Sequence, residues 1–387
     1  MTNTEPIVIL GVGMTPVGEH WQLSLRTLAL QAMDKALGEA RDLRPQALYV
    51  ANMLAPSLSG QAHLGALLAD FAGMRGMEAV TVEAAGASGG LALRQGCLAL
   101  AAGAHDVALV VGIEKVTDHV GSGLEAALMA SGDSDYEAAH GLTPTALAAL
   151  RMRRYLHEAG APPDALAGFS RAAHAHAVAN PYAIYRKAIS VDDYRKAPMV
   201  SEPVNLYDAA PMADGAAALL VARVSALKGN YPNPVAVRGI GVATSSVALH
   251  EMRDPLDLPA ARLSAERAYA QASFGPGDVD LFEAHDAFTI YAALAVEAAG
   301  FAKRGQGWRL AAEGRIDPGG TLPMLTFGGS KARGDSGGAT GVYQIAEVVL
   351  QLQGRADGNQ VPGARRGMAQ CLGGSGGTAV TTMLEAA

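Results

Sequence analysis

Two glycine-rich turns, each followed by a helical stretch, contain the positions at which this sequence could act on a carbonyl group. The first turn spans residues 83–90 (Glu-Ala-Ala-Gly-Ala-Ser-Gly-Gly) and the second spans residues 334–341 (Gly-Asp-Ser-Gly-Gly-Ala-Thr-Gly). Backbone N–H groups at the start of a helix can stabilise a developing oxyanion. Gly86 supplies such a group in the first turn, whereas we expect Asp335 in the second to cap the following helix.

Three further side chains are candidates for proton transfer or for contact with a polarised carbonyl: His285, Tyr291 and Tyr343. A free tyrosine has a pKa of about 10, so a tyrosine that acts as a base must lie near donors or a positive charge. Alone, each tyrosine is better explained as a buried ring with a satisfied hydroxyl. His285, followed by Asp286, is compatible with helix capping as well as with a polar contact to substrate.

Other motifs give no support for a metal or a nucleotide. His174 and His176 stand two residues apart, which places them on different faces of a helix, and no acidic cluster accompanies them. The Gly-Val-Gly at residues 11–13 lacks the third glycine and the acidic residue of a dinucleotide site. Two cysteines are too few for a disulfide scaffold or a structural zinc site. We expect no metal and no organic cofactor.

The composition describes a large α/β globular protein. Of the 387 residues, 50% are hydrophobic and 17% are charged, and 46 are glycine. The net charge of −7 argues against general affinity for nucleic acid or an anionic membrane. The apolar stretch at residues 7–12 is too short for a signal sequence or a membrane span. We therefore expect a soluble, cytoplasmic protein.

The chain carries an internal duplication. Each half opens with a short apolar strand, continues through a helical stretch to a second strand, and ends with the glycine turn, a helix and a third apolar strand. The strands expected at corresponding places are residues 7–13 and 235–241, 48–50 and 279–282, and 106–112 and 367–374. Strands that alternate with helices imply parallel β-α-β units and a layered α/β/α fold.

A different segment separates the two halves. It is richer in His, Tyr, Arg and Pro, and it is predicted to be a mainly helical loop or cap domain over the duplicated core. The predicted organisation is an N-terminal half at residues 1–115, an inserted domain at 116–231 and a C-terminal half at 232–387.

These features resemble the thiolase superfamily, and in particular the sterol-carrier-protein-type thiolases. The motifs that carry the resemblance are residues 11–15 (Gly-Val-Gly-Met-Thr), 112–115 (Gly-Ile-Glu-Lys), 207–218 (Tyr-Asp-Ala-Ala-Pro-Met-Ala-Asp-Gly-Ala-Ala-Ala) and 285–289 (His-Asp-Ala-Phe-Thr). The similarity covers essentially the whole chain and implies the thiolase fold, with two duplicated core halves.

Two departures from the family pattern exclude a normal thiolase. Gly86 occupies the position of the nucleophilic cysteine, and Asp335 replaces the histidine of the family's Gly-His-Pro turn. Acyl transfer needs a thiolate and a nearby base, and glycine has no side chain. Ser88 is a poor substitute, because each residue at a helix start turns the side chain about 100° around the axis.

The resemblance implies that the groups that bind and polarise the thioester remain. Gly373, in a sequence similar to the family's Cys-x-Gly loop that begins at Cys371, would hold the thioester oxygen together with Gly86. His285 matches the histidine that contacts the second carbonyl. Cys371 is ambiguous: it is either part of this loop or a buried, inert thiol.

One group of thiolase-like proteins without the nucleophile is similar in these departures: the aldolases of bacterial steroid side-chain degradation. That group depends on two tyrosines, which the resemblance places at Tyr291 and Tyr343. It implies retro-aldol cleavage of a β-hydroxyacyl-CoA, with a steroid or similar side chain, to a ketone and propionyl-CoA or acetyl-CoA. CoA enters only as part of the substrate.

The resemblance also implies partners. It predicts a homodimer and a small protein with an OB fold and a zinc ribbon, associated with an enoyl-CoA hydratase. Two alternatives stay open. The chain could be a catalytically silent subunit that binds acyl-CoA or scaffolds a complex, or an acyltransferase that uses Cys371 or Ser88 as a substitute nucleophile.

Overall fold

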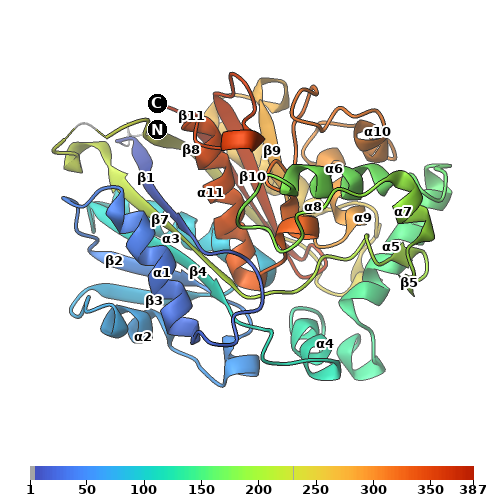
Figure 1. Cartoon of the computed structure of the whole chain (residues 1–387), viewed down its shortest axis with the longest axis horizontal. Helices are drawn as coiled ribbons and strands as arrows, with labels where there is room; N and C mark the ends of the chain where they lie inside the picture. The colour runs from blue at the N-terminus through green and yellow to red at the C-terminus, as the bar shows by residue number, and fades with distance from the viewer. Residues whose placement is uncertain (1–4, 230) are drawn as a thin grey trace.

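One nine-stranded sheet dominates the computed structural model, which describes residues 5–229 and 231–387 (Figure 1). Its strand order is β3-β2-β4-β7-β1-β8-β11-β10-β9. The strands are β1 (Ile7–Met14), β2 (Ala47–Ala51), β3 (Glu78–Val82), β4 (Val107–Glu114), β7 (Gly215–Arg223), β8 (Val235–Thr244), β9 (Leu281–Ala284), β10 (Arg366–Gly373) and β11 (Thr378–Ala386). The helices of the two halves are α1 (Leu25–Gly38), α2 (Leu64–Phe71), α3 (Ser88–Ala101), α8 (Pro259–Ala272), α9 (Thr289–Ala298), α10 (Gly307–Ala312) and α11 (Thr340–Leu352).

The duplication is visible in the sheet. The first half contributes the order β3-β2-β4-β7-β1 and the second half the mirrored order β8-β11-β10-β9. The halves join where β1 pairs with β8 in antiparallel fashion. The counterpart of β3 in the second half is reduced to one parallel bridge between Phe282 and Met324. The predicted α/β fold with two related halves is confirmed.

The sheet is mixed, although the alternation of strands and helices implied parallel units. Only the pairs β2–β3, β2–β4 and β9–β10 are parallel, and the remaining pairs are antiparallel. One cause is β7, which returns through the centre of the first half between β4 and β1. These residues lie within the range 116–231 for which we expected an insertion, so the core sheet takes a strand from that range.

The helices α3 and α11 pack against one another at the centre of the molecule (Figure 1). Every residue of α11 is buried. A Cβ atom at Gly89 would lie only 2.4 Å from the backbone nitrogen of Val342, so the close approach of the two helix starts requires glycine there. This packing brings the two glycine turns, from opposite halves of the sequence, to one place.

A group of mainly helical segments covers this place from one side. It consists of α4 (Ser122–Met129), α5 (Pro144–Glu158), α6 (Ala167–Ala177), α7 (Val191–Lys196) and the short strands β5 (Met199–Ser201) and β6 (Val204–Asn205). In Figure 1 the green helices α5, α6 and α7 lie beside the second half, far from β2 and β3. Within the described ranges, no helix combines the length and apolarity needed to cross a membrane.

Candidate active site

A cavity of about 760 Å³ lies between the two glycine turns and the helical cap. This volume falls in the range of small-molecule sites, and most of the lining is apolar. Its walls include Leu124, Leu128, Met129, Leu147, Ile184, Ile189, Val200, Leu206 and Phe288. The polar or ionisable groups that reach it from the core are His285, Tyr291, Lys331 and Asp335. An apolar chamber with a few convergent polar groups suits a hydrophobic substrate with one reactive polar centre.

Gly86 lines this cavity at the predicted position, but the space for a side chain is filled. A Cβ atom on Gly86 would lie 2.5 Å from the carbonyl oxygen of Leu372 and 2.9 Å from Cε1 of His285. The preceding Ala85 has a left-handed backbone with a φ of 51°, which is unfavourable for a residue with a side chain. The strained turn therefore contributes backbone atoms of Gly86 to the cavity wall, and no nucleophilic side chain.

His285 follows β9 and takes up part of the space beside Gly86. It is almost fully buried, and burial lowers its pKa, although the nearby carboxylates of Asp335 and Asp286 oppose the shift. The imidazole is therefore neutral near pH 7 and can donate one hydrogen bond. Its Nδ1 has no hydrogen-bond partner among the described residues. Nε2 is the ring nitrogen closer to Gly86.

Asp335 also lines the cavity, just before the short helix at residues 337–339. Oδ1 accepts hydrogen bonds from the N–H of Gly337 at 3.0 Å and from the hydroxyl of Thr340 at 2.7 Å, as expected for a residue before a helix. The backbone of Asp335 is held on both sides, because its N–H donates to Pro211 and its carbonyl accepts from Ala213, each at 2.9 Å. The second carboxylate oxygen, Oδ2, makes no hydrogen bond within the described residues.

Tyr291, on the first turn of α9, reaches the cavity as predicted. Its hydroxyl lies 3.4 Å from Oγ of Ser375, another lining residue, and its ring packs edge-on against Phe288. The guanidinium of Arg151 lies 5.5 Å from the ring centroid and is fully buried. Arg151 therefore lies against the ring of Tyr291 as a cation–π partner.

Tyr343 does not reach the cavity. It is fully buried on α11, and its hydroxyl donates to the carbonyl oxygen of Thr15 at 2.9 Å. Burial raises the pKa of Tyr343, mainly through desolvation. Its ring packs on the guanidinium of Arg333 at 4.8 Å. This environment is that of a structural tyrosine that ties α11 to the end of β1, so the geometry gives no support to the predicted catalytic role.

The predicted substitutes for the nucleophile also lie outside the cavity. Cys371 is buried on β10 between the starts of α3 and α11, and burial raises the pKa of its thiol to about 12. Ser88 is fully buried, and its hydroxyl donates to the carbonyl of Ala85 at 2.6 Å. Gly373 does not line the cavity, but its neighbours Leu372 and Gly374 do. Neither side chain can attack a substrate in this arrangement.

Lys331 is a site residue that the sequence analysis did not single out. It is buried, it lines the cavity, and its ammonium donates to the backbone carbonyls of Asp208 and Ala287. Burial lowers its pKa to about 8, although nearby carboxylates oppose the shift. One feature of the sequence could have pointed to Lys331: it lies between a pair of glycines and the Asp335 turn, in residues 328–335 (Gly-Gly-Ser-Lys-Ala-Arg-Gly-Asp).

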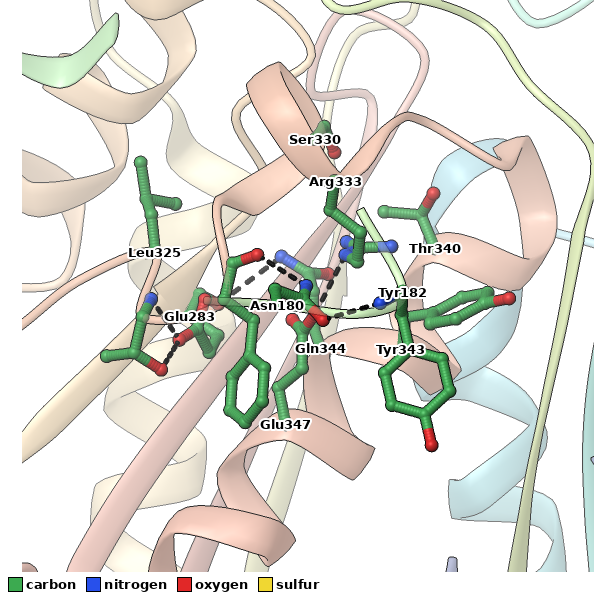
Figure 2. A network of polar contacts seen from close by, with 12 residues as sticks. Asn180, Tyr182, Glu283, Leu325, Ser330, Arg333, Thr340, Tyr343, Gln344 and Glu347 are labelled. Atoms are coloured by element: carbon green, nitrogen blue, oxygen red, sulfur yellow. Dashed lines mark hydrogen bonds and ion pairs between the residues drawn. The ribbon is translucent and has the colours of Figure 1, made fainter. Parts of the chain in front are cut away.

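A buried polar network lies behind this segment (Figure 2). Nε of Arg333 lies 2.8 Å from Oε1 of Glu347 on α11, and both side chains are fully buried. Glu283 on β9 accepts hydrogen bonds from the backbone N–H and the hydroxyl of Thr326. Figure 2 shows these groups converging from β9, α11 and residues 325–333. The network fixes the segment that leads to Asp335.

Family models match nearly the whole chain. The thiolase N-terminal domain matches residues 7–225, and the thiolase C-terminal domain-like family matches residues 241–386. The chain belongs to the thiolase superfamily. The predicted resemblance is therefore confirmed, and with it the membership of a family of enzymes that act on acyl-CoA.

Relatives of this thiolase-family chain differ in their activities. It is 40% identical to an acetyl-CoA acetyltransferase of Methanothermobacter thermautotrophicus, over 96% of this chain and 97% of the relative. It is 32% identical to a 17-hydroxy-3-oxo-4-pregnene-20-carboxyl-CoA lyase of Mycobacterium tuberculosis, over 57% of this chain and 58% of the relative. The solved Ltp2-ChsH2(DUF35) aldolase superposes with a TM-score of 0.83 at 24% identity, covering 100% of this chain and 99% of that one. Overall similarity thus does not decide between acyl transfer and lyase chemistry.

Proposed function

We propose that this protein is a carbon–carbon lyase that cleaves a β-hydroxyacyl-CoA by a retro-aldol reaction. The observation that carries the proposal is the environment of Gly86. A thiolase needs a thiolate there, and the carbonyl of Leu372 and the ring of His285 take up the space of such a side chain. A retro-aldol reaction needs only a base and donors that stabilise an enolate.

The reaction balances without any covalent intermediate. A base accepts the proton of the β-hydroxyl, and the electron pair of that O–H bond forms the new ketone C=O bond. The bond between the α and β carbons breaks, and its electron pair passes into the thioester enolate. The α carbon then gains one proton, which gives a ketone and a shorter acyl-CoA. No oxidant, reductant or cofactor enters.

Residues of the cavity fit these steps. A thioester oxygen placed beside Gly86 would meet the backbone N–H of Gly86 and the neutral ring of His285. Tyr291, with Arg151 against its ring, would contact the hydroxyl-bearing end of the substrate. The apolar walls of the cavity favour an acyl group with a bulky hydrocarbon part. A steroid side chain such as that of the mycobacterial lyase's substrate is our proposed substrate class.

The proposed assembly is a homodimer with an OB-fold and zinc-ribbon partner associated with an enoyl-CoA hydratase, in the cytoplasm. β3 is an edge strand of the sheet, and Val80 on it is 41% exposed, so a second copy could pair there. The name of the Ltp2-ChsH2(DUF35) aldolase supports a partner of the DUF35 type. Size-exclusion chromatography of the wild type and of Val80→Lys tests the dimer, which the charge should disrupt.

The test of activity uses 17-hydroxy-3-oxo-4-pregnene-20-carboxyl-CoA, with the chain alone and with a DUF35 partner. Cleavage between carbons 17 and 20 yields a 17-ketone and propionyl-CoA in equal amounts. The matched control is the same thioester without the 17-hydroxyl, which cannot undergo the reaction. If the protein releases no propionyl-CoA from the hydroxylated thioester under either condition, this substrate assignment is wrong.

A catalytically silent acyl-CoA-binding subunit is the second candidate. The observation in its favour is that Tyr343, one of the two predicted catalytic tyrosines, is committed to Thr15 outside the cavity. Such a protein would bind the CoA thioester and return it unchanged in the same assay. An acyltransferase is disfavoured, because Cys371 and Ser88 do not line the cavity.

A further inference from the structure

A general base must touch the substrate, so it must line the cavity. Tyr343 is excluded by its burial and its bond to Thr15. We assign His285 to the thioester oxygen instead, because its ring lies beside the Gly86 turn. Lys331 is held by two backbone carbonyls. Two carboxylates line the cavity within the described residues: Glu125, on α4 of the helical cap, and Asp335, which follows the Lys331 segment of the core. Asp335 is nearly fully buried beside the Gly86 turn and His285, and its Oδ2 makes no hydrogen bond to any described residue.

We propose that Asp335 is the general base of the retro-aldol reaction, an inference that rests on the proposed function. Its Oδ2 accepts the proton of the β-hydroxyl and returns a proton to the α carbon of the enolate, so the carboxylate is regenerated in each turnover. The two transfers balance the reaction, because the substrate loses one O–H bond and the product gains one C–H bond. Asp335 thus performs proton transfer at the position where thiolases carry a histidine.

The geometry prepares Asp335 for this role. Two donors hold Oδ1, from Gly337 and Thr340, and two backbone hydrogen bonds hold its main chain. A side chain fixed in this way has one orientation and presents only Oδ2 to a ligand. The ammonium of Lys331 lies close enough to interact with the charge of Asp335.

The decisive variant is Asp335→Asn, because the asparagine oxygen can still accept from Gly337 and Thr340 and so keeps the cap. We expect the affinity for propionyl-CoA to stay within threefold of wild type, and cleavage of 17-hydroxy-3-oxo-4-pregnene-20-carboxyl-CoA to fall by about 10² to 10⁴, the usual worth of a general base. The matched control is Thr340→Val, which removes one hydrogen bond to Oδ1 but leaves the carboxylate. A purely structural role predicts a loss in Asp335→Asn that is no larger than the loss in Thr340→Val.

A second readout separates this inference from the proposed substrate. Wild-type protein in D₂O should exchange the α hydrogens of propionyl-CoA, as mass spectrometry detects, and Asp335→Asn should lose this exchange by a similar factor. Added formate should restore exchange and cleavage to Asp335→Ala by roughly tenfold or more, because formate replaces the missing carboxylate.

Near-normal exchange and cleavage in Asp335→Asn would overturn the inference while leaving the lyase intact. If the wild type exchanges the α hydrogens in a way that depends on Asp335 but does not cleave the steroid thioester, Asp335 is supported as the base and the proposed substrate is wrong. Cleavage that drops equally in Asp335→Asn and Thr340→Val, with no rescue by formate, would reduce Asp335 to a cap and overturn the inference.

Discussion

Gly86→Cys, which restores the thiolase nucleophile, should not restore thiolysis. The structure indicates the expected loss of stability and of rate. The new Cβ would overlap the carbonyl oxygen of Leu372 at 2.5 Å, a backbone atom that cannot rotate away, and Cε1 of His285 at 2.9 Å. Overpacking of a close-packed site costs about 1–3 kcal/mol. The thiolate would also lack the turn histidine, since Asp335 stands there, and the loss of such a base is worth about 10² to 10⁴ in rate.

The assay is thiolysis of acetoacetyl-CoA by free CoA, with thermal unfolding measured on the same samples. Gly86→Ala is the matched control, because it has the same Cβ contacts but no thiol. We expect both variants to unfold at a lower temperature than wild type and neither to show thiolysis above background. Gly86→Cys with Asp335→His should regain at most weak activity, because His285 still occupies the site. Efficient thiolysis by the single variant, at wild-type stability, would show that the crowding argument is wrong.

Three further predictions concern single side chains. In steady-state kinetics, Tyr291→Phe should lower the cleavage rate by about 10² to 10⁴ and retain binding of propionyl-CoA. Tyr343→Phe should change the rate less than tenfold and lower the free energy of unfolding, measured with denaturant, by about 1 kcal/mol. A larger loss of rate in Tyr343→Phe than in Tyr291→Phe would show that Tyr343 is the catalytic tyrosine. The Cys371→Ala variant should retain the cleavage rate of the wild type, because burial raises the pKa of the Cys371 thiol to about 12 and keeps it protonated. A large loss of rate would show that the thiol takes part in the reaction. Burial, with added repulsion from Glu347, raises the pKa of Glu283 to about 8. Burial raises the pKa of Glu347 to about 7, although Arg333 opposes the shift. The folded state therefore binds these protons more tightly, so this contribution to stability is complete below pH of about 4.5 and is lost as pH rises through about 7 to 8. Glu283→Gln should flatten that decline in melting temperature, and an unchanged slope would show that the pair does not titrate there.

The fold was accessible from sequence because its signals are local and repeated. Apolar runs such as residues 7–13 and 106–112 mark buried strands, and the same order recurs in the second half. The glycine turns indicate that two helices begin close to other backbone atoms. The close approach of Gly89 to Val342 confirms this. Strand direction was less accessible, because the return of β7 to the centre of the sheet depends on tertiary pairing and leaves no local pattern.

The site was accessible in part. Gly86, His285 and Tyr291 line the cavity, as the resemblance to the thiolase family led us to expect. Tyr343 does not, since the direction of its side chain on α11 depends on packing against Arg333 and Thr15. Asp335 was expected to cap the following helix. Its side chain does bond to Gly337 and Thr340 at that helix start, although the N-cap residue is Ser336. That Asp335 also lines the cavity and keeps one oxygen without a hydrogen bond among the described residues depends on tertiary packing, which the sequence does not show.

The mass of the intact protein during turnover tests the central claim most directly. If a lyase without a nucleophile is the correct account, incubation with 17-hydroxy-3-oxo-4-pregnene-20-carboxyl-CoA will produce propionyl-CoA and the 17-ketone together. The protein mass will stay unchanged at every time point, and no free CoA will be released. An acyl adduct that forms and decays at the rate of turnover, with release of free CoA, would reveal a covalent intermediate and contradict the account.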